Sequence, residues 1–142
     1  MELAAAVSAV QRASDGKGGF RLSIGGGAHA AGKARREISR LRADLDPPLL
    51  ESVRLLVTEL VTNSVRHADA GTVELTVLVG TERVRVEIAN PGSPFDPVLR
   101  QEDPTSDEGW GLFLVDRISD SWGVLEEDAG RQRVWFELRR SA

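Results

Sequence analysis

The chain has 142 residues, of which 41% are hydrophobic and 28% charged. A chain of this length buries about 70% of its unfolded surface in one core, so we expect a single folded domain. The net charge of −4 argues against a general binder of nucleic acid or anionic membranes, and the absence of cysteine excludes disulfides, iron–sulfur clusters, thiolate zinc sites and a cysteine nucleophile.

The N-terminal segment lacks the features of a targeting sequence. It has no basic leader, and no apolar run in the chain reaches the ~18–20 residues of a membrane span. We therefore expect a cytoplasmic protein. A short helix is predicted over residues 1–13, ended by a glycine-rich run. Residues 1–19 are predicted to form a flexible arm and residues 20–142 the folded domain.

The remaining pattern predicts five strands and three helices. Alternation of apolar and polar residues predicts strands, and a 3.6-residue period predicts helices. The predicted strands are Phe20–Ile24, Thr72–Val79, Arg83–Ala89, Trp122–Glu126 and Arg133–Arg139, and the predicted helices are Ala28–Leu45, Leu49–Ala68 and Trp110–Ser119. Because strands and helices do not alternate strictly, we expect an α+β fold. It would be a two-layer α/β sandwich with a mixed, mostly antiparallel sheet and its helices on one face.

The helix Leu49–Ala68 carries the first candidate site. Its apolar face is predicted to bury against the sheet and consists of Leu49, Val53, Leu56, Val57, Leu60 and Ser64. Glu59 and Asn63 are one turn apart at the edge of this face, so their side chains lie one above the other. A carboxylate and an amide at these positions can line a cleft while Leu60 anchors the helix.

Two glycine-containing segments are further candidates. Asn90-Pro91-Gly92 follows a strand, and an ordinary turn also explains it. Gly109-Trp110-Gly111-Leu112 opens a short helix, where free backbone N–H groups attract phosphate. A glycine pair before a helix is also explained as a turn. The order of the three segments along the chain is what favours a nucleotide site.

A competing phosphate-binding motif lies earlier in the chain. Residues 27–33 have the spacing G-x-x-x-x-G-K of a P-loop. The next residue is Ala34, whereas a P-loop needs a Ser or Thr hydroxyl for Mg²⁺. We therefore expect Gly32 and Lys33 to belong to an exposed helix face.

The segments Glu59–Ala68, Gly109–Val115 and Val134–Leu138 resemble motifs of the GHKL superfamily. Within it, they are most similar to the small bacterial anti-sigma factor serine/threonine kinases of the RsbW type. The resemblance extends over residues 20–139 and implies the Bergerat, or histidine-kinase-like ATPase, fold. It also implies a kinase that sequesters a sigma factor and phosphorylates a STAS-type anti-sigma factor antagonist on serine. Direct contact with nucleic acid or membrane is not implied, and relatives of this kind often form homodimers.

The resemblance further implies ATP and Mg²⁺ as cofactors. Asn63 matches the asparagine that ligates Mg²⁺, and Glu59 matches the acidic residue proposed as general base for the attacking serine hydroxyl. Residues 93–108 match the lid over the nucleotide. The positions implied to bind the nucleotide are Asn63, Arg66, Asn90, Gly92, Gly109, Trp110, Gly111 and Leu112.

Three positions depart from the family pattern. Asn90 stands where the family has the aspartate that accepts the adenine amino proton, and Pro94 replaces the second glycine of that box. Arg133 stands where the family often has a small hydroxyl residue beside the adenine. These departures leave open a catalytically inactive binding module of the same fold. A sensor histidine kinase is disfavoured, because we expect no phosphoacceptor helix pair ahead of Phe20.

Overall fold

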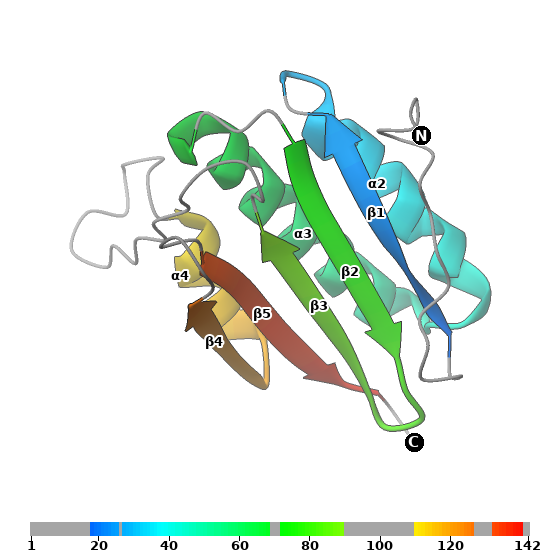
Figure 1. Cartoon of the computed structure of the whole chain (residues 1–142). Helices are drawn as coiled ribbons and strands as arrows, with labels where there is room; N and C mark the ends of the chain where they lie inside the picture. The colour runs from blue at the N-terminus through cyan, green and yellow to red at the C-terminus, as the bar shows by residue number, and fades with distance from the viewer. Residues whose placement is uncertain (1–17, 26, 69–71, 90–109, 127–131, 141–142) are drawn as a thin grey trace.

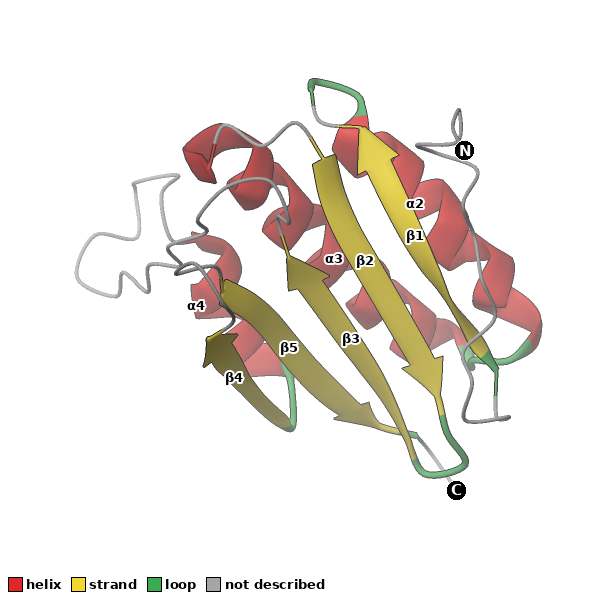
Figure 2. Ribbon diagram, in the orientation of Figure 1, coloured by secondary structure: helices red, strands yellow, loops and turns green. Residues whose placement is uncertain are grey.

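A computed structural model of the chain describes residues 18–25, 27–68, 72–89, 110–126 and 132–140. These residues form a five-stranded sheet with helices on one face (Figures 1 and 2). The strands are β1 (Gly19–Gly25), β2 (Thr72–Val79), β3 (Arg83–Ala89), β4 (Ser121–Glu126) and β5 (Gln132–Arg139). The helices are α2 (Ala30–Ser39), the short 3₁₀ helix η1 (Arg40–Ala43), α3 (Pro47–Ala68) and α4 (Trp110–Ile118). The expected α+β two-layer fold is confirmed.

The strands are ordered β1-β2-β3-β5-β4, and each neighbouring pair is antiparallel. A mixed sheet was expected, but the strands that the structure describes include no parallel pair. β2 and β3 form a hairpin, in which the Gly80 amide donates a hydrogen bond to the Arg83 carbonyl at 2.9 Å. β5 then lies between β3 and β4, so the last two strands complete the sheet beside β3.

The two faces of the sheet differ because successive side chains point to opposite sides. On β3, Val84, Val86 and Ile88 are fully buried in the core shared with the helices. The intervening side chains lie on the other side, which we call the open face. Its charged and aromatic residues are Arg21, Glu74, Arg83, Arg85, Glu87, Arg133, Trp135, Glu137 and Arg139.

Helix α3 buries the face that the sequence predicted. All six residues of that face are at most 7% exposed: Leu49, Val53, Leu56, Val57, Leu60 and Ser64. The helix begins two residues earlier than expected, because Pro47 and Pro48 form its first turn. The fixed φ of proline suits this position, and its missing N–H would have no partner there. The Leu50 amide donates to the Asp46 carbonyl at 2.9 Å.

The predicted helix Ala28–Leu45 is shorter and ends differently. The α-helical part is α2, and η1 follows it as a tighter turn. The amides of Asp44 and Leu45 both donate to the Leu41 carbonyl, at 2.8 and 3.0 Å. This tightening turns the chain toward α3 while Leu41 and Leu45 remain buried.

The other predicted elements match within a few residues, and β1 begins at Gly19 instead of Phe20. The predicted lid lies outside the described residues, as does the arm up to residue 17. Within the part of the chain that the structure describes, no helix is long and apolar enough to cross a membrane.

Candidate functional site

Three elements meet at one end of the sheet, which we call the Ala89 end. β3 ends at Ala89, which pairs with Glu74 near the start of β2, and β2 begins four residues after the last residue of α3. α4 leads into β4 at the opposite end of the sheet, so its first turn, at Trp110, points back toward the Ala89 end (Figure 1). α3 and α4 pack against each other. The elements of all three candidate segments therefore converge.

Glu59 and Asn63 lie in the C-terminal half of α3, the half nearer the Ala89 end. Asn63 is only 8% exposed, and Glu59 is half-buried. Leu60, between them in sequence, is fully buried and fixes the rotation of the helix against the sheet. This arrangement matches the expectation of a polar pair beside an apolar anchor.

The remaining candidate residues fall into two groups. Arg66 is in α3, and Trp110, Gly111 and Leu112 form the first turn of α4. The other candidate positions lie outside the described residues: Asn90, Gly92, Pro94 and Gly109. The structure thus brings the elements together without describing every side chain of the predicted site.

Arg133 does not lie where the sequence analysis expected it. On β5, Val134 and Phe136 are buried in the core, so Arg133 points to the open face, on the other side of the sheet from α3. Its guanidinium lies 3.4 Å from a Glu74 carboxylate oxygen and 3.7 Å from one of Glu87. The expectation that Arg133 occupies the adenine side is therefore wrong.

The P-loop alternative also finds no support in the fold. Gly27 precedes α2, and Lys33 lies in the first turn of that helix. Ala34, at the position where a P-loop carries its hydroxyl, is fully buried in the core. A hydroxyl at this position would point into the core and not toward a metal.

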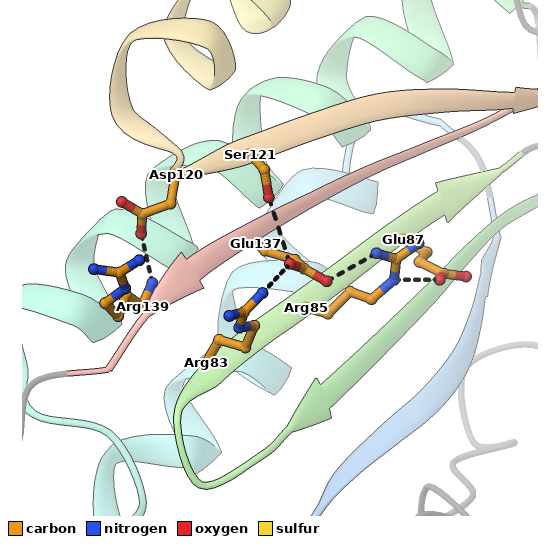
Figure 3. A network of polar contacts seen from close by, with 7 residues as sticks. All are labelled: Arg83, Arg85, Glu87, Asp120, Ser121, Glu137 and Arg139. Atoms are coloured by element: carbon orange, nitrogen blue, oxygen red, sulfur yellow. Dashed lines mark hydrogen bonds and ion pairs between the residues drawn. The ribbon is translucent and has the colours of Figure 1, made fainter.

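A network of ion pairs on the open face was not predicted (Figure 3). Arg85 donates to Glu87 at 2.8 Å and to Glu137 at 2.9 Å, and Arg83 donates to Glu137 at 3.2 Å. Burial alone would raise the pKa of the Glu137 carboxyl, but hydrogen bonds from Arg85 and Arg83 and their charges outweigh burial and lower it. At Arg85, burial alone would lower the pKa of the guanidinium, but the hydrogen bonds to Glu87 and Glu137 and their charges outweigh burial and raise it. The alternating sequence of β3 predicted a polar face, but only the register with β5 reveals the pairs.

A pocket of about 230 Å³ lies at the end of the sheet opposite the Ala89 end. It is lined by Arg83, Asp120, Ser121, Glu137, Leu138 and Arg139. The Asp120 carboxylate accepts a hydrogen bond from the Arg139 amide at 2.6 Å, which ties the start of β4 to the end of β5. Because of its position, this pocket is not part of the predicted nucleotide site.

The two-layer fold, with its antiparallel sheet and helices on one face, agrees with a class of kinase-like ATPase domains. The family described as "Histidine kinase-like ATPase domain" matches residues 28–138, which is most of the chain. The chain belongs to this family.

Among curated proteins, the chain is similar to serine-protein kinases named RsbW. The protein of Listeria monocytogenes serotype 4a is 28% identical over 94 residues, covering 56% of this chain and 60% of the relative. That of Staphylococcus epidermidis is 30% identical over 105 residues, covering 63% of this chain and 65% of the relative. The chain thus spans somewhat less than two thirds of the length of these relatives.

Proposed function

We propose that this chain is a cytoplasmic, ATP-dependent serine/threonine kinase that holds a sigma factor and phosphorylates an anti-sigma factor antagonist on serine. Membership of the histidine kinase-like ATPase family and similarity to proteins named as serine-protein kinases support the class. The observation that carries the proposal is the placement of Glu59 and Asn63. They are one turn apart on α3, on the half of the helix nearer the end of the sheet where β3 ends and α4 begins.

The donor chemistry of Asn63 fits Mg²⁺. An amide oxygen is a hard ligand of the kind that Mg²⁺ prefers. Because Mg²⁺ usually keeps several water ligands and is also coordinated by substrate phosphates, one protein ligand is sufficient. Its near-complete burial restricts the rotamers of Asn63 and would hold the amide in a fixed orientation. When bound, the metal would neutralise charge on the phosphates.

Glu59 and the first turn of α4 supply the remaining functions in this proposal. The Glu59 carboxylate would accept the proton of the serine hydroxyl that attacks the terminal phosphate. The first amides of α4 have no partner within the helix, and the positive end of the helix dipole favours phosphate there. Together with the metal, these groups meet the positioning and charge requirements of phosphoryl transfer.

The test compares Glu59→Gln with wild type and with Glu51→Gln. The second variant is a control that makes the same change at another glutamate of α3. Glu51 is exposed and pairs with Arg54 at 2.8 Å. Each protein is incubated with Mg-ATP and STAS-type proteins of the source organism, and phosphoserine is quantified by mass spectrometry. We expect Glu59→Gln to lower the rate by about 10²-fold or more while ATP binding and the Glu51→Gln rate stay near wild type. Equal rates for all three proteins would reject Glu59 as the base.

A second function, a binding module without phosphoryl transfer, is favoured by Asn90 and Pro94, which depart from the family's adenine-binding box. Arg133 no longer supports it, because this side chain lies on the open face. In that case the chain would bind its partner equally with and without nucleotide. A flat calorimetric trace with both ATP and ADP would favour this second function.

A further inference from the structure

Helix α2 and η1 form a strongly basic segment of an otherwise acidic chain. Residues 30–43 carry five basic side chains and one acidic one, a local charge of +4 in a chain of net charge −4. The basic residues are Lys33, Arg35, Arg36, Arg40 and Arg42. Cations near a helix C-terminus stabilise the helix dipole. This explanation does not apply to Lys33, which lies in the first turn of α2.

Few ion pairs within the described part of the chain use these cations. Arg40 pairs with Glu37 at 3.6 Å with its side chain 75% exposed, a geometry that contributes little. The other four form no ion pair with any residue in the described ranges. On the open face, Arg83, Arg85 and Arg133 are paired with glutamates, whereas the exposed Arg21 and Arg139 form no ion pair with the described residues. The basic charge of α2 is therefore available to another molecule.

Arg36 and Arg40 lie on the outer side of the helix layer, as does an exposed apolar side chain of α3, and Lys33 and Arg35 flank them on either side of α2. α2 buries Ala30, Ala34 and Ile38, so Arg36 and Arg40 lie on the side of the helix away from the core. α3 packs beside α2 in the same layer (Figure 1) and exposes Leu55 by 42%. A short connection joins the two helices, so they run antiparallel and their outer sides form one surface. We call the six residues Lys33, Arg35, Arg36, Arg40, Arg42 and Leu55 the α2–α3 surface.

We propose that the α2–α3 surface docks an acidic amphipathic helix of a protein partner. Carboxylates of that helix would pair with the arginines, whose planar guanidinium groups match carboxylate geometry, and one apolar side chain would contact Leu55. Charge complementarity of this kind steers encounter and sets orientation. A nucleic acid fits less well, because the chain is acidic overall and because an apolar residue belongs to the surface. The inference rests on the proposed function, since it gives that kinase the surface on which it holds its partner.

The test uses designed peptides as probes. A fluorescein-labelled amphipathic helix with Glu on its polar face and Leu on its apolar face is compared with one carrying Lys for Glu and one carrying Ser for Leu. Binding is followed by fluorescence anisotropy at low and high salt. The variant is Arg36→Glu/Arg40→Glu. The matched control is Arg21→Glu/Arg139→Glu, which makes the same change of charge at exposed positions on two other elements, β1 and β5.

We expect wild type to bind the Glu/Leu peptide at least about tenfold tighter than either altered peptide, and high salt to weaken that binding. The α2 variant should lose about tenfold or more in affinity, whereas the control should stay within about threefold. Equal losses in both variants, or equal binding of all peptides, would overturn the proposal. Tighter binding of a short DNA duplex, lost in the same variant, would assign the surface to nucleic acid instead. Nucleotide binding is measured in parallel. If wild type binds ATP but shows no preference among the peptides, the docking surface alone is rejected. If wild type binds no ATP, the proposed function is rejected.

Discussion

The indole ring of Trp135 lies directly over Gly123, its cross-strand partner on β4. A β-carbon at Gly123 would come within 2.9 Å of the ring. On the other strand beside β5, the Arg85 guanidinium lies 4.3 Å from the ring centroid, and Glu87 and Glu137 hold that guanidinium in place. The glycine is therefore a packing requirement of β4 and not a turn residue.

Gly123→Ala should destabilise the fold by about 1–3 kcal/mol, because the pinned ring has to move to admit a methyl group. Urea denaturation followed by circular dichroism measures this free energy of unfolding. The control is Gly32→Ala in α2, where an added β-carbon would meet only an Arg35 nitrogen at 3.8 Å. That substitution should stabilise the protein by about 0.5–1 kcal/mol, since alanine is the better helix former. Similar effects at the two positions would contradict the packing argument.

Glu137→Gln should lower the free energy of unfolding at pH 7 by about 1–3 kcal/mol, because it removes charge-assisted hydrogen bonds to Arg83 and Arg85. The pKa of Glu137 is lower in the folded state than its usual value of 4.5. Its contribution is therefore fully present above that value and is lost as the pH falls through the folded pKa.

The stability difference between wild type and Glu137→Gln should accordingly shrink as the pH is lowered from 5 toward about 3. Denaturation curves at several pH values measure it. Glu82→Gln, at an exposed position of the β2–β3 hairpin, serves as the control and should stay within about 0.5 kcal/mol of wild type throughout. A difference that does not change with pH would contradict the role of the carboxylate charge.

Ser64→Ala should leave the fold equally stable or stabilise it by about 1 kcal/mol. The Ser64 hydroxyl is fully buried and forms no hydrogen bond with any described residue, so its removal abolishes a desolvation cost. The matched change, Ser119→Ala, removes a hydrogen bond to the Val115 carbonyl at 2.6 Å and should cost about 0.5–1.5 kcal/mol. Thermal denaturation distinguishes them, and a larger loss at Ser64 would show that its hydroxyl has a partner.

The helices were predictable because their periodicity is local. The face of α3 from Leu49 to Ser64 follows from a 3.6-residue repeat alone, and its burial agrees residue by residue. The 3₁₀ turn at η1 was missed, because hydrogen-bond geometry at a helix end depends on the path of the following chain. The order of β5 and β4 in the sheet was also missed, since it depends on contacts between distant residues.

In the candidate site, too, the features that depend on local spacing could be predicted, and those that depend on the sheet could not. Glu59 and Asn63 follow from helical spacing, which fixes their relation to each other and to Leu60. The side of the sheet on which Arg133 lies follows instead from strand parity, because the buried Val134 and Phe136 alternate with it on β5. Its pairing with Glu74, 59 residues away in sequence, requires the sheet register and leaves no local signal.

The proposed kinase activity depends on the binding of Mg-ATP at the Ala89 end of the sheet through Asn63. Isothermal titration of the full chain with ATP in the presence and absence of Mg²⁺ tests it most directly. We expect micromolar binding that depends on Mg²⁺ and weakens by about tenfold or more in Asn63→Ala, with the affinity of Glu51→Gln unchanged. No binding by wild type, or binding that is unaffected by both Mg²⁺ and Asn63→Ala, would contradict it.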